Sequence, residues 1–169
     1  MSTQGHVPVS ADAVRVWLED VMDPEIPVLN VNELGVVRDI VWSEGRLRVD
    51  VTPTYSGCPA ARVIEAAIEA RIREGGIDEV EVRRVLTPPW SSTWMRPEAR
   101  EKLRAYRIVP PEPDRAGGTF PWSRPAPRIE CPACGAPEPE RVSEFGSTPC
   151  KAQYRCTRCL EPFEYFKCI

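Results

Sequence analysis

The stretch "TPTYSGCPAARVIEAAIEARI" (Thr52–Ile72) decides the fold, because it runs from the end of a strand through a tight turn into an amphipathic helix. The apolar positions of its second half recur at helical spacing and predict a helix from about Pro59 to Arg73. The pair Gly75-Gly76 then ends the pattern, as glycines commonly do at helix C-termini. The expected apolar stripe contains Val63, Ala67, Ile68 and Ile72.

The segments on either side of this stretch complete a small domain. Residues 10–21 carry apolar side chains at helical spacing behind Ser10, a possible N-cap. "LGVVRDIVW" and "RLRVDVTP" read as two β-branched strands around the turn "SEG", and "DEVEVRRVL" reads as a third. The order helix–strand–strand–helix–strand predicts an α+β sandwich over residues 10–105.

The rest of the chain divides into a linker and a tail. Residues 106–128 are dense in proline and glycine and poor in aliphatic side chains, which is typical of an extended linker. Residues 129–169 hold six of the seven cysteines. So short a piece has too little apolar core to fold alone, and a metal ion would supply much of its folding free energy.

The tail carries two C-x-x-C knuckles. Their spacing lets four thiolates converge on one ion and predicts a structural zinc ribbon, with a disulfide pair or an iron–sulfur cluster as the alternatives. The segments "RVSEF" and "KAQYRC" between the knuckles can form a hairpin. Cys150 and Cys168 are left over, either as small buried apolar residues, which we favour, or as an alternative ligand or a redox pair. The four expected zinc ligands are Cys131, Cys134, Cys156 and Cys159.

Cys58 lies far from these cysteines, directly before the expected helix. Pro59 suits the first helical position, so Cys58 is expected at the N-cap or beside it. The free N–H groups and the dipole at a helix start would favour a thiolate, which is a nucleophile or a soft metal ligand. The alternative is that Cys58 only fills space beneath the helix.

Composition limits the classes of function. The single histidine, His6, argues against triads that need a catalytic imidazole. A net charge of -3 argues against nucleic acid as a partner. The sequence shows no apolar run long enough to span a membrane and no secretory signal at its N-terminus, so we expect a cytoplasmic protein with reduced thiols and no membrane partner.

Three motifs together carry a family resemblance: "DPEIPVLNVNELGVVRDI", "TPTYSGCPA" and "PPWSSTWM". They resemble the metal–sulfur cluster assembly domain of SufT-like proteins. With the cysteine-rich tail added, residues 10–169 resemble the PaaD (or PaaJ) family of phenylacetyl-CoA epoxidase subunits, which serve phenylacetate degradation. The resemblance implies the same α+β domain plus a zinc ribbon, with Cys58 as the reactive thiol and Asp23, Glu25 and Thr54 around it.

The resemblance also implies a function and its partners. We expect an accessory protein, not catalytic by itself, that assembles or delivers iron–sulfur clusters for the multicomponent epoxidase. Its cofactor would be structural zinc, together with a transient iron–sulfur cluster. Its partners would be the epoxidase components, especially the iron–sulfur flavin reductase, and general iron–sulfur assembly proteins. The alternative is a stoichiometric docking subunit of the epoxidase. Thiol oxidoreductase chemistry would require tail cysteines that cycle through disulfides without metal.

Overall fold

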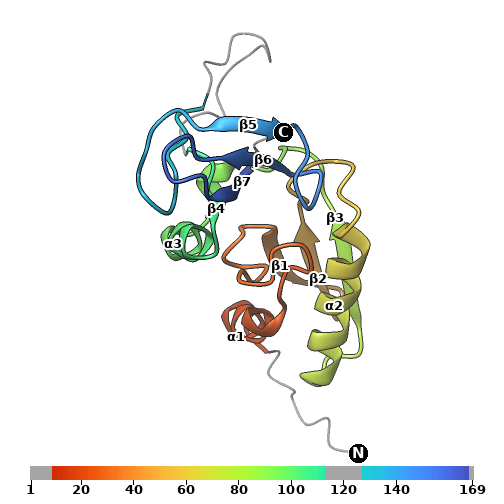
Figure 1. Cartoon of the computed structure of the whole chain (residues 1–169). Helices are drawn as coiled ribbons and strands as arrows, with labels where there is room; N and C mark the ends of the chain where they lie inside the picture. The colour runs from red at the N-terminus through yellow and green to blue at the C-terminus, as the bar shows by residue number, and fades with distance from the viewer. Residues whose placement is uncertain (1–8, 113–126, 168–169) are drawn as a thin grey trace, which may run out of the picture.

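The computed structural model describes residues 9–112 and 127–167. Its first part contains the predicted order of elements (Figure 1). The helix α1 (Ala11–Trp17) continues into a 3-10 turn, η1 (Leu18–Asp20), and is followed by β1 (Val37–Ser43), β2 (Arg46–Val51), α2 (Ala61–Glu74) and β3 (Val80–Arg84). β1 pairs antiparallel with β2, and β3 pairs parallel with β2 across the α2 connection. The α+β prediction is confirmed.

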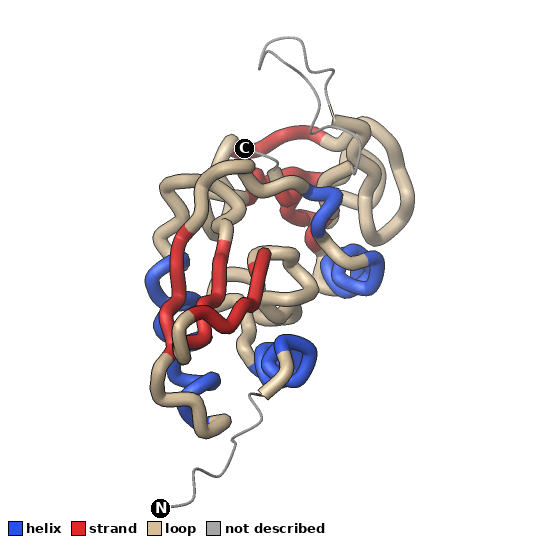
Figure 2. Tube along the Cα trace, turned by 180° about the vertical axis from the view of Figure 1, so that it is seen from behind, coloured by secondary structure: helices blue, strands red, loops and turns tan. Residues whose placement is uncertain are grey.

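Local chemistry explains these boundaries. The Ser10 hydroxyl accepts a hydrogen bond from the backbone N–H of Ala13 and caps α1. Glu44 and Gly45 both adopt positive φ, as the tight turn between β1 and β2 requires. Seen from behind, the strands of this sheet stand in front of α2, which covers the opposite face (Figure 2).

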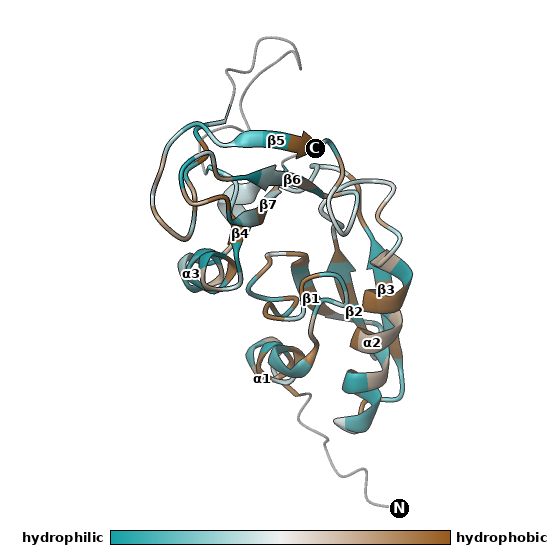
Figure 3. Ribbon diagram, viewed as in Figure 1, coloured by the Kyte–Doolittle hydropathy of each residue, from teal (hydrophilic) through white to brown (hydrophobic). Residues whose placement is uncertain are grey.

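The helix α2 differs from its prediction in start and in orientation. It begins at Ala61, two residues later than expected, so Pro59 is not its first residue. The predicted apolar stripe is right in part. Ile68 and Ile72 are fully buried as expected, but Val63 is 57% exposed. Polar and apolar stretches alternate along the helix (Figure 3). The stripe that faces the core is Ala61, Ile64, Ile68 and Ile72.

The second part of the structure is a ribbon joined to the first by two short helical segments. The 3-10 turn η2 (Ser92–Trp94) and the helix α3 (Pro97–Ala105) lead into β4 (Ile108–Val109). The tail adds β5 (Glu140–Ser143), β6 (Lys151–Arg155) and β7 (Pro162–Phe166). The sheet order is β4-β7-β6-β5, with β4 parallel to β7 and the other pairs antiparallel. The predicted hairpin is therefore β5 and β6.

The expected linker, 106–128, is not connecting chain throughout. Its residues Ile108–Val109 form β4 and hydrogen-bond with the tail. Residues 113–126 of that linker lie outside the described part of the chain. Neither the helix α3 nor the strand β4 was predicted.

The α+β domain and the ribbon share one core. Phe166 of β7 is fully buried in the same apolar cluster as the residues of α2 and β2. Its ring meets the edge of Trp90, with ring centroids 5.8 Å apart, and the indole N–H of Trp90 donates to the Leu34 carbonyl. The two parts are thus packed as one body. Over the part of the chain that the structure describes, no helix has the length and apolar character that crossing a membrane requires.

Candidate metal centre and thiol site

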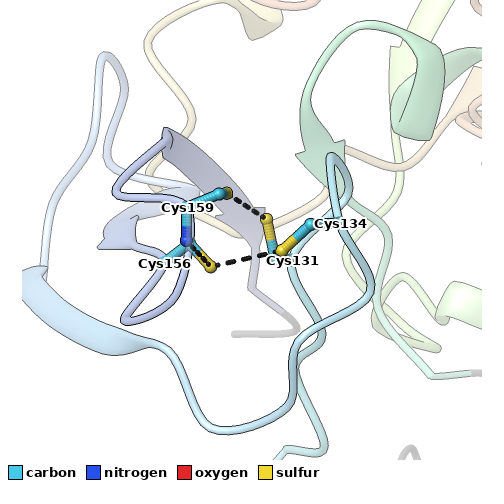
Figure 4. Close-up of side chains that lie close together, drawn as sticks. All are labelled: Cys131, Cys134, Cys156 and Cys159. Carbon is cyan, nitrogen blue, oxygen red and sulfur yellow. Dashed lines mark hydrogen bonds between the residues drawn. The ribbon is translucent and has the colours of Figure 1, made fainter.

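The ribbon brings its four predicted zinc ligands together. The thiol sulfurs of Cys131, Cys134, Cys156 and Cys159 all lie within 4.8 Å of one another. The two knuckles face each other, with 3.7 Å between the sulfurs of Cys131 and Cys159 and 3.6 Å between those of Cys134 and Cys156 (Figure 4). Zinc–sulfur bonds of about 2.3 Å in a tetrahedron place sulfurs about 3.8 Å apart. The four thiols therefore fit a tetrahedral zinc ion.

Backbone N–H groups favour the thiolate form of two of these sulfurs, those of Cys134 and Cys156. The N–H groups of Cys159 and Arg158 donate to the sulfur of Cys156 and lower its pKa to about 6. The N–H of Ala136 lowers the pKa of Cys134 in the same way. Hydrogen bonds to the charged form of a thiol favour that form. This part of the chain is a four-thiol metal-binding site of the zinc-ribbon type.

Cys58 lies in the turn between β2 and α2, at the side of a small cavity. The cavity measures about 20 Å³, which is room for one water-sized ligand or ion. Cys58 precedes the N-cap, Ala60, by two residues and is half-buried. Of the predicted supporting residues, Asp23 and Thr54 line the cavity together with Cys58.

Asp23 is held by its own loop. Its carboxylate oxygen Oδ1 accepts two backbone hydrogen bonds of 2.8 Å, from the N–H groups of Glu25 and Ile26. The side chain is buried, and this burial raises the pKa of Asp23 although both hydrogen bonds act to lower it. A buried carboxylate at the wall of a cavity is a natural oxygen ligand for a cation.

Glu25 does not line this cavity, although the sequence grouped it with Asp23. Its oxygen Oε2 lies 3.7 Å from the Cys150 sulfur of the ribbon. Burial and the nearby Asp23 charge raise the pKa of Glu25. The carboxylate also acts on Cys58, whose pKa it raises. Glu25 therefore contacts the ribbon at Cys150 and Lys151.

The electrostatics of Cys58 differ from the prediction of a stabilised thiolate. Burial raises the pKa of the Cys58 thiol, and the charges of Glu25 and Asp23 raise it further. The backbone N–H groups of Ala60 and Ala61 lower it, as expected at a helix start, but their effect is smaller. Without a cation the thiol stays neutral, whereas a bound metal ion would favour the deprotonated ligand.

The surroundings of two further residues of this region were not predicted from the sequence. The hydroxyl of Tyr55 is buried, and no hydrogen-bond partner for it occurs among the described residues. Cys150 is 3% exposed and belongs to the shared core, as the favoured interpretation of the sequence predicts, but it also contacts Glu25. No sequence spacing relates Cys150 to Glu25, since 125 residues separate them.

Comparison with known proteins agrees with the two parts of the structure. Residues 11–87 match the model of the family "Iron-sulfur cluster assembly protein", and residues 118–167 match the "PaaD zinc beta ribbon domain". A solved structure from Bacillus anthracis, a domain of unknown function called DUF59, is 30% identical. It superposes with a TM-score of 0.51 over 54% of this chain and 89% of its own length.

Two curated proteins extend the comparison. An "Fe-S protein maturation auxiliary factor" of Porphyromonas gingivalis (strain ATCC BAA-308 / W83) is 35% identical over 94 residues, which are 54% of this chain and 88% of that protein. A protein of Escherichia coli (strain K12), provisionally named as one of the subunits of 1,2-phenylacetyl-CoA epoxidase, is 44% identical over 92% of both chains. The chain therefore belongs to the PaaD family of phenylacetyl-CoA epoxidase subunits, in which a zinc ribbon follows an iron–sulfur assembly domain.

Proposed function

We propose that this protein is a non-catalytic accessory factor that assembles or delivers iron–sulfur clusters to the flavin reductase component of phenylacetyl-CoA epoxidase. The cluster is cargo, which Cys58 holds only in passing. The ribbon zinc is structural. General iron–sulfur assembly proteins would supply the cluster.

The observation that carries this proposal is the pairing of Cys58 with the buried Asp23 at one small cavity. A single thiol whose pKa is raised binds iron with loss of a proton and can regain that proton when the cargo leaves. Such a site favours exchange over permanent storage, since four thiolates would hold the cluster more firmly.

The test is the iron content of the reductase. We expect reductase produced with wild-type protein to contain its cluster iron and sulfide, and reductase produced with the Cys58→Ser variant to lack most of both. Ser56→Ala, an exposed change in the same turn, is the matched control and should behave as wild type. Zinc in the variant should stay at one ion per chain, which shows that the ribbon has folded. A fully loaded reductase beside Cys58→Ser would refute the proposal.

A docking subunit is the second candidate, and the surface of the ribbon favours it. Val142, Phe145 and Leu160 are each about 60% exposed, an unusual amount for large apolar side chains on so small a unit. A docking subunit would copurify with the epoxidase in fixed ratio. A maturation factor would be absent from the purified working complex, so the stoichiometry of that complex separates the two candidates.

A further inference from the structure

The motif "PPWSSTWM" holds two tryptophans that lie at different depths. Trp90 is buried in the shared core, whereas Trp94 is only half-buried. The guanidinium of Arg38, from β1, stacks on the ring of Trp94, with its Cζ atom 3.3 Å from the ring centroid. Stacking uses the flat face of a guanidinium, so the N–H groups at its edge can still bind a planar anion.

Two more arginines lie around this stacked pair. Nη2 of Arg15, in α1, is 3.5 Å from the backbone carbonyl oxygen of Arg38. Arg96 follows Trp94 by two residues and lies 4.0 Å from the carboxylate of Glu19, which comes one helical turn after Arg15. These contacts join α1, β1 and the segment around η2 into one surface. We call it the arginine surface, made of Arg15, Arg38, Trp94 and Arg96.

The positive charge of this surface is poorly compensated. Arg48 and Arg71, which are also half-buried, each form an ion pair with an aspartate. Over the described residues, by contrast, neither Arg15 nor Arg38 forms an ion pair with a carboxylate. Burial lowers the pKa of Arg38, and the charge of Arg15 lowers it further, as expected for a cation beside another cation. A chain with 25 acidic and 22 basic side chains could have supplied partners for both arginines.

The chemistry of the surface indicates the kind of ligand that it fits. The planar, forked guanidinium matches a carboxylate and can bind it through two parallel hydrogen bonds. Arginine clusters recognise acidic segments of other proteins in this way. A net charge of -3 disfavours nucleic acid, which binds to broad basic fields. No residue of the arginine surface is a zinc ligand or lines the Cys58 cavity, so neither of those sites accounts for it.

We propose that the arginine surface docks an acidic segment of a partner protein. Arg15 and Arg38 bind its carboxylates, the ring of Trp94 holds the Arg38 guanidinium in place, and Arg96 adds a third positive charge. This inference goes beyond the proposed function, because it concerns how a partner is held and requires nothing of Cys58. It also gives a role to the exposed half of the "PPWSSTWM" motif.

The experiment adds a hexaglutamate peptide to full-length, zinc-loaded protein and follows two-dimensional amide and indole spectra at low salt. The indole N–H signal of Trp94, assigned from the spectrum of Trp94→Phe, should shift together with the signals of residues around Arg15 and Arg38. Arg38→Gln and Arg15→Gln should each weaken binding at least ~5-fold, because each removes a charge-assisted hydrogen bond. Added salt should weaken binding by wild-type protein.

Arg62→Gln is the matched control. Arg62 is an exposed arginine of α2 that also forms no ion pair among the described residues, and its replacement changes the net charge by the same amount. This variant should bind hexaglutamate as wild-type protein does, and a hexaglutamine peptide should shift no signal. Zinc content and the dispersion of the amide spectrum show whether each variant has folded.

Three outcomes would overturn the proposal. The first is the absence of shifts at millimolar hexaglutamate, and the second is an equal loss of binding in Arg62→Gln and Arg38→Gln. The third is tighter binding of a single-stranded oligothymidylate at the same residues, which would assign the surface to nucleic acid. The reductase test with Cys58→Ser is independent of all three, so either proposal can fail while the other stands.

Discussion

The ionised form of Asp23 would help to bind a cation, but burying that charge lowers the stability of the metal-free fold. Its two backbone hydrogen bonds are made through one oxygen, and an asparagine could keep both. Burial raises the pKa of Asp23, so the folded protein holds that proton more tightly than the unfolded chain does. Ionised Asp23 therefore destabilises the metal-free fold at neutral pH, and this cost disappears as the pH falls below the pKa of the unfolded chain.

Asp23→Asn should accordingly raise the free energy of unfolding at pH 7 by on the order of 1 kcal/mol in protein that carries zinc in the ribbon alone. The same variant should bind less iron or cobalt at the Cys58 site, because it loses a charged oxygen ligand. Urea unfolding of both proteins at pH 7 and at pH 5 measures the first effect, which should be smaller at the lower pH. A gain in stability that is as large at the lower pH would contradict the electrostatic explanation.

Gly35 is required by a close approach of two backbone segments. It has a φ of +75°, and an added Cβ would collide with the backbone carbonyl of Trp94. Gly35→Ala should therefore cost on the order of 3 kcal/mol of unfolding free energy, since a backbone clash is added to the strained φ. Gly45→Ala is the matched control: its φ is +79° but its surroundings are open, so only about 1 kcal/mol should be lost. Equal losses in urea unfolding would argue against the clash.

Among the secondary-structure elements, those of the ribbon depend on their metal more than on their own core. Apart from two metal-ligand cysteines, the separate apolar cluster of the ribbon holds only Ile129, Ala136, Phe163 and Tyr165 as buried members. Cys159 is the exposed ligand, so its replacement removes a metal bond without leaving a cavity.

We expect Cys159→Ser to lose zinc and the dispersed amide signals of β5 and β6, while the signals of α2 and β1–β3 persist. Two-dimensional amide spectra with and without a chelator measure this, and chelation of the wild type should reproduce the variant. Thr157→Ser, in the same knuckle and also exposed, should keep both metal and spectrum. Loss of the α2 signals in the variant would show that the two parts do not differ in their need for zinc.

Across the molecule as one body, Phe166 couples the ribbon to the α+β domain. Phe166→Ala should cost about 3–5 kcal/mol, as for other large core truncations, and should separate the unfolding of the two parts into two transitions. Differential scanning calorimetry measures this. A single unchanged transition would show that the shared core is not what joins the parts.

Much of this architecture could be predicted from short-range patterns. The Ser10 cap, the "SEG" turn and the two C-x-x-C knuckles each lie within a few residues, so their geometry follows from local chemistry. The helix α3 was missed although Pro97 at its first position and the buried pair Ala99 and Leu103, four residues apart, are helix signals.

The candidate site could be predicted only in part. Family motifs grouped Asp23 with Cys58, and the cavity brings those two together. The contact of Glu25 with Cys150 depends on how the ribbon docks, which no local pattern encodes. The pKa of Cys58 was predicted with the wrong sign, because helix-start amides are visible in the sequence whereas burial and facing carboxylates are not.

The pairing of β4 with β7 has a consequence for how this protein can be divided. Because Ile108 and Val109 hydrogen-bond with the tail, and Phe166 is seated in the first domain, the covalent connection between residues 112 and 127 is not what keeps the halves together. Two fragments, 1–112 and 127–169, produced in one cell are expected to reassemble as a split protein. Each half would then recover the other through strand complementation, and a tag on either one should retrieve both.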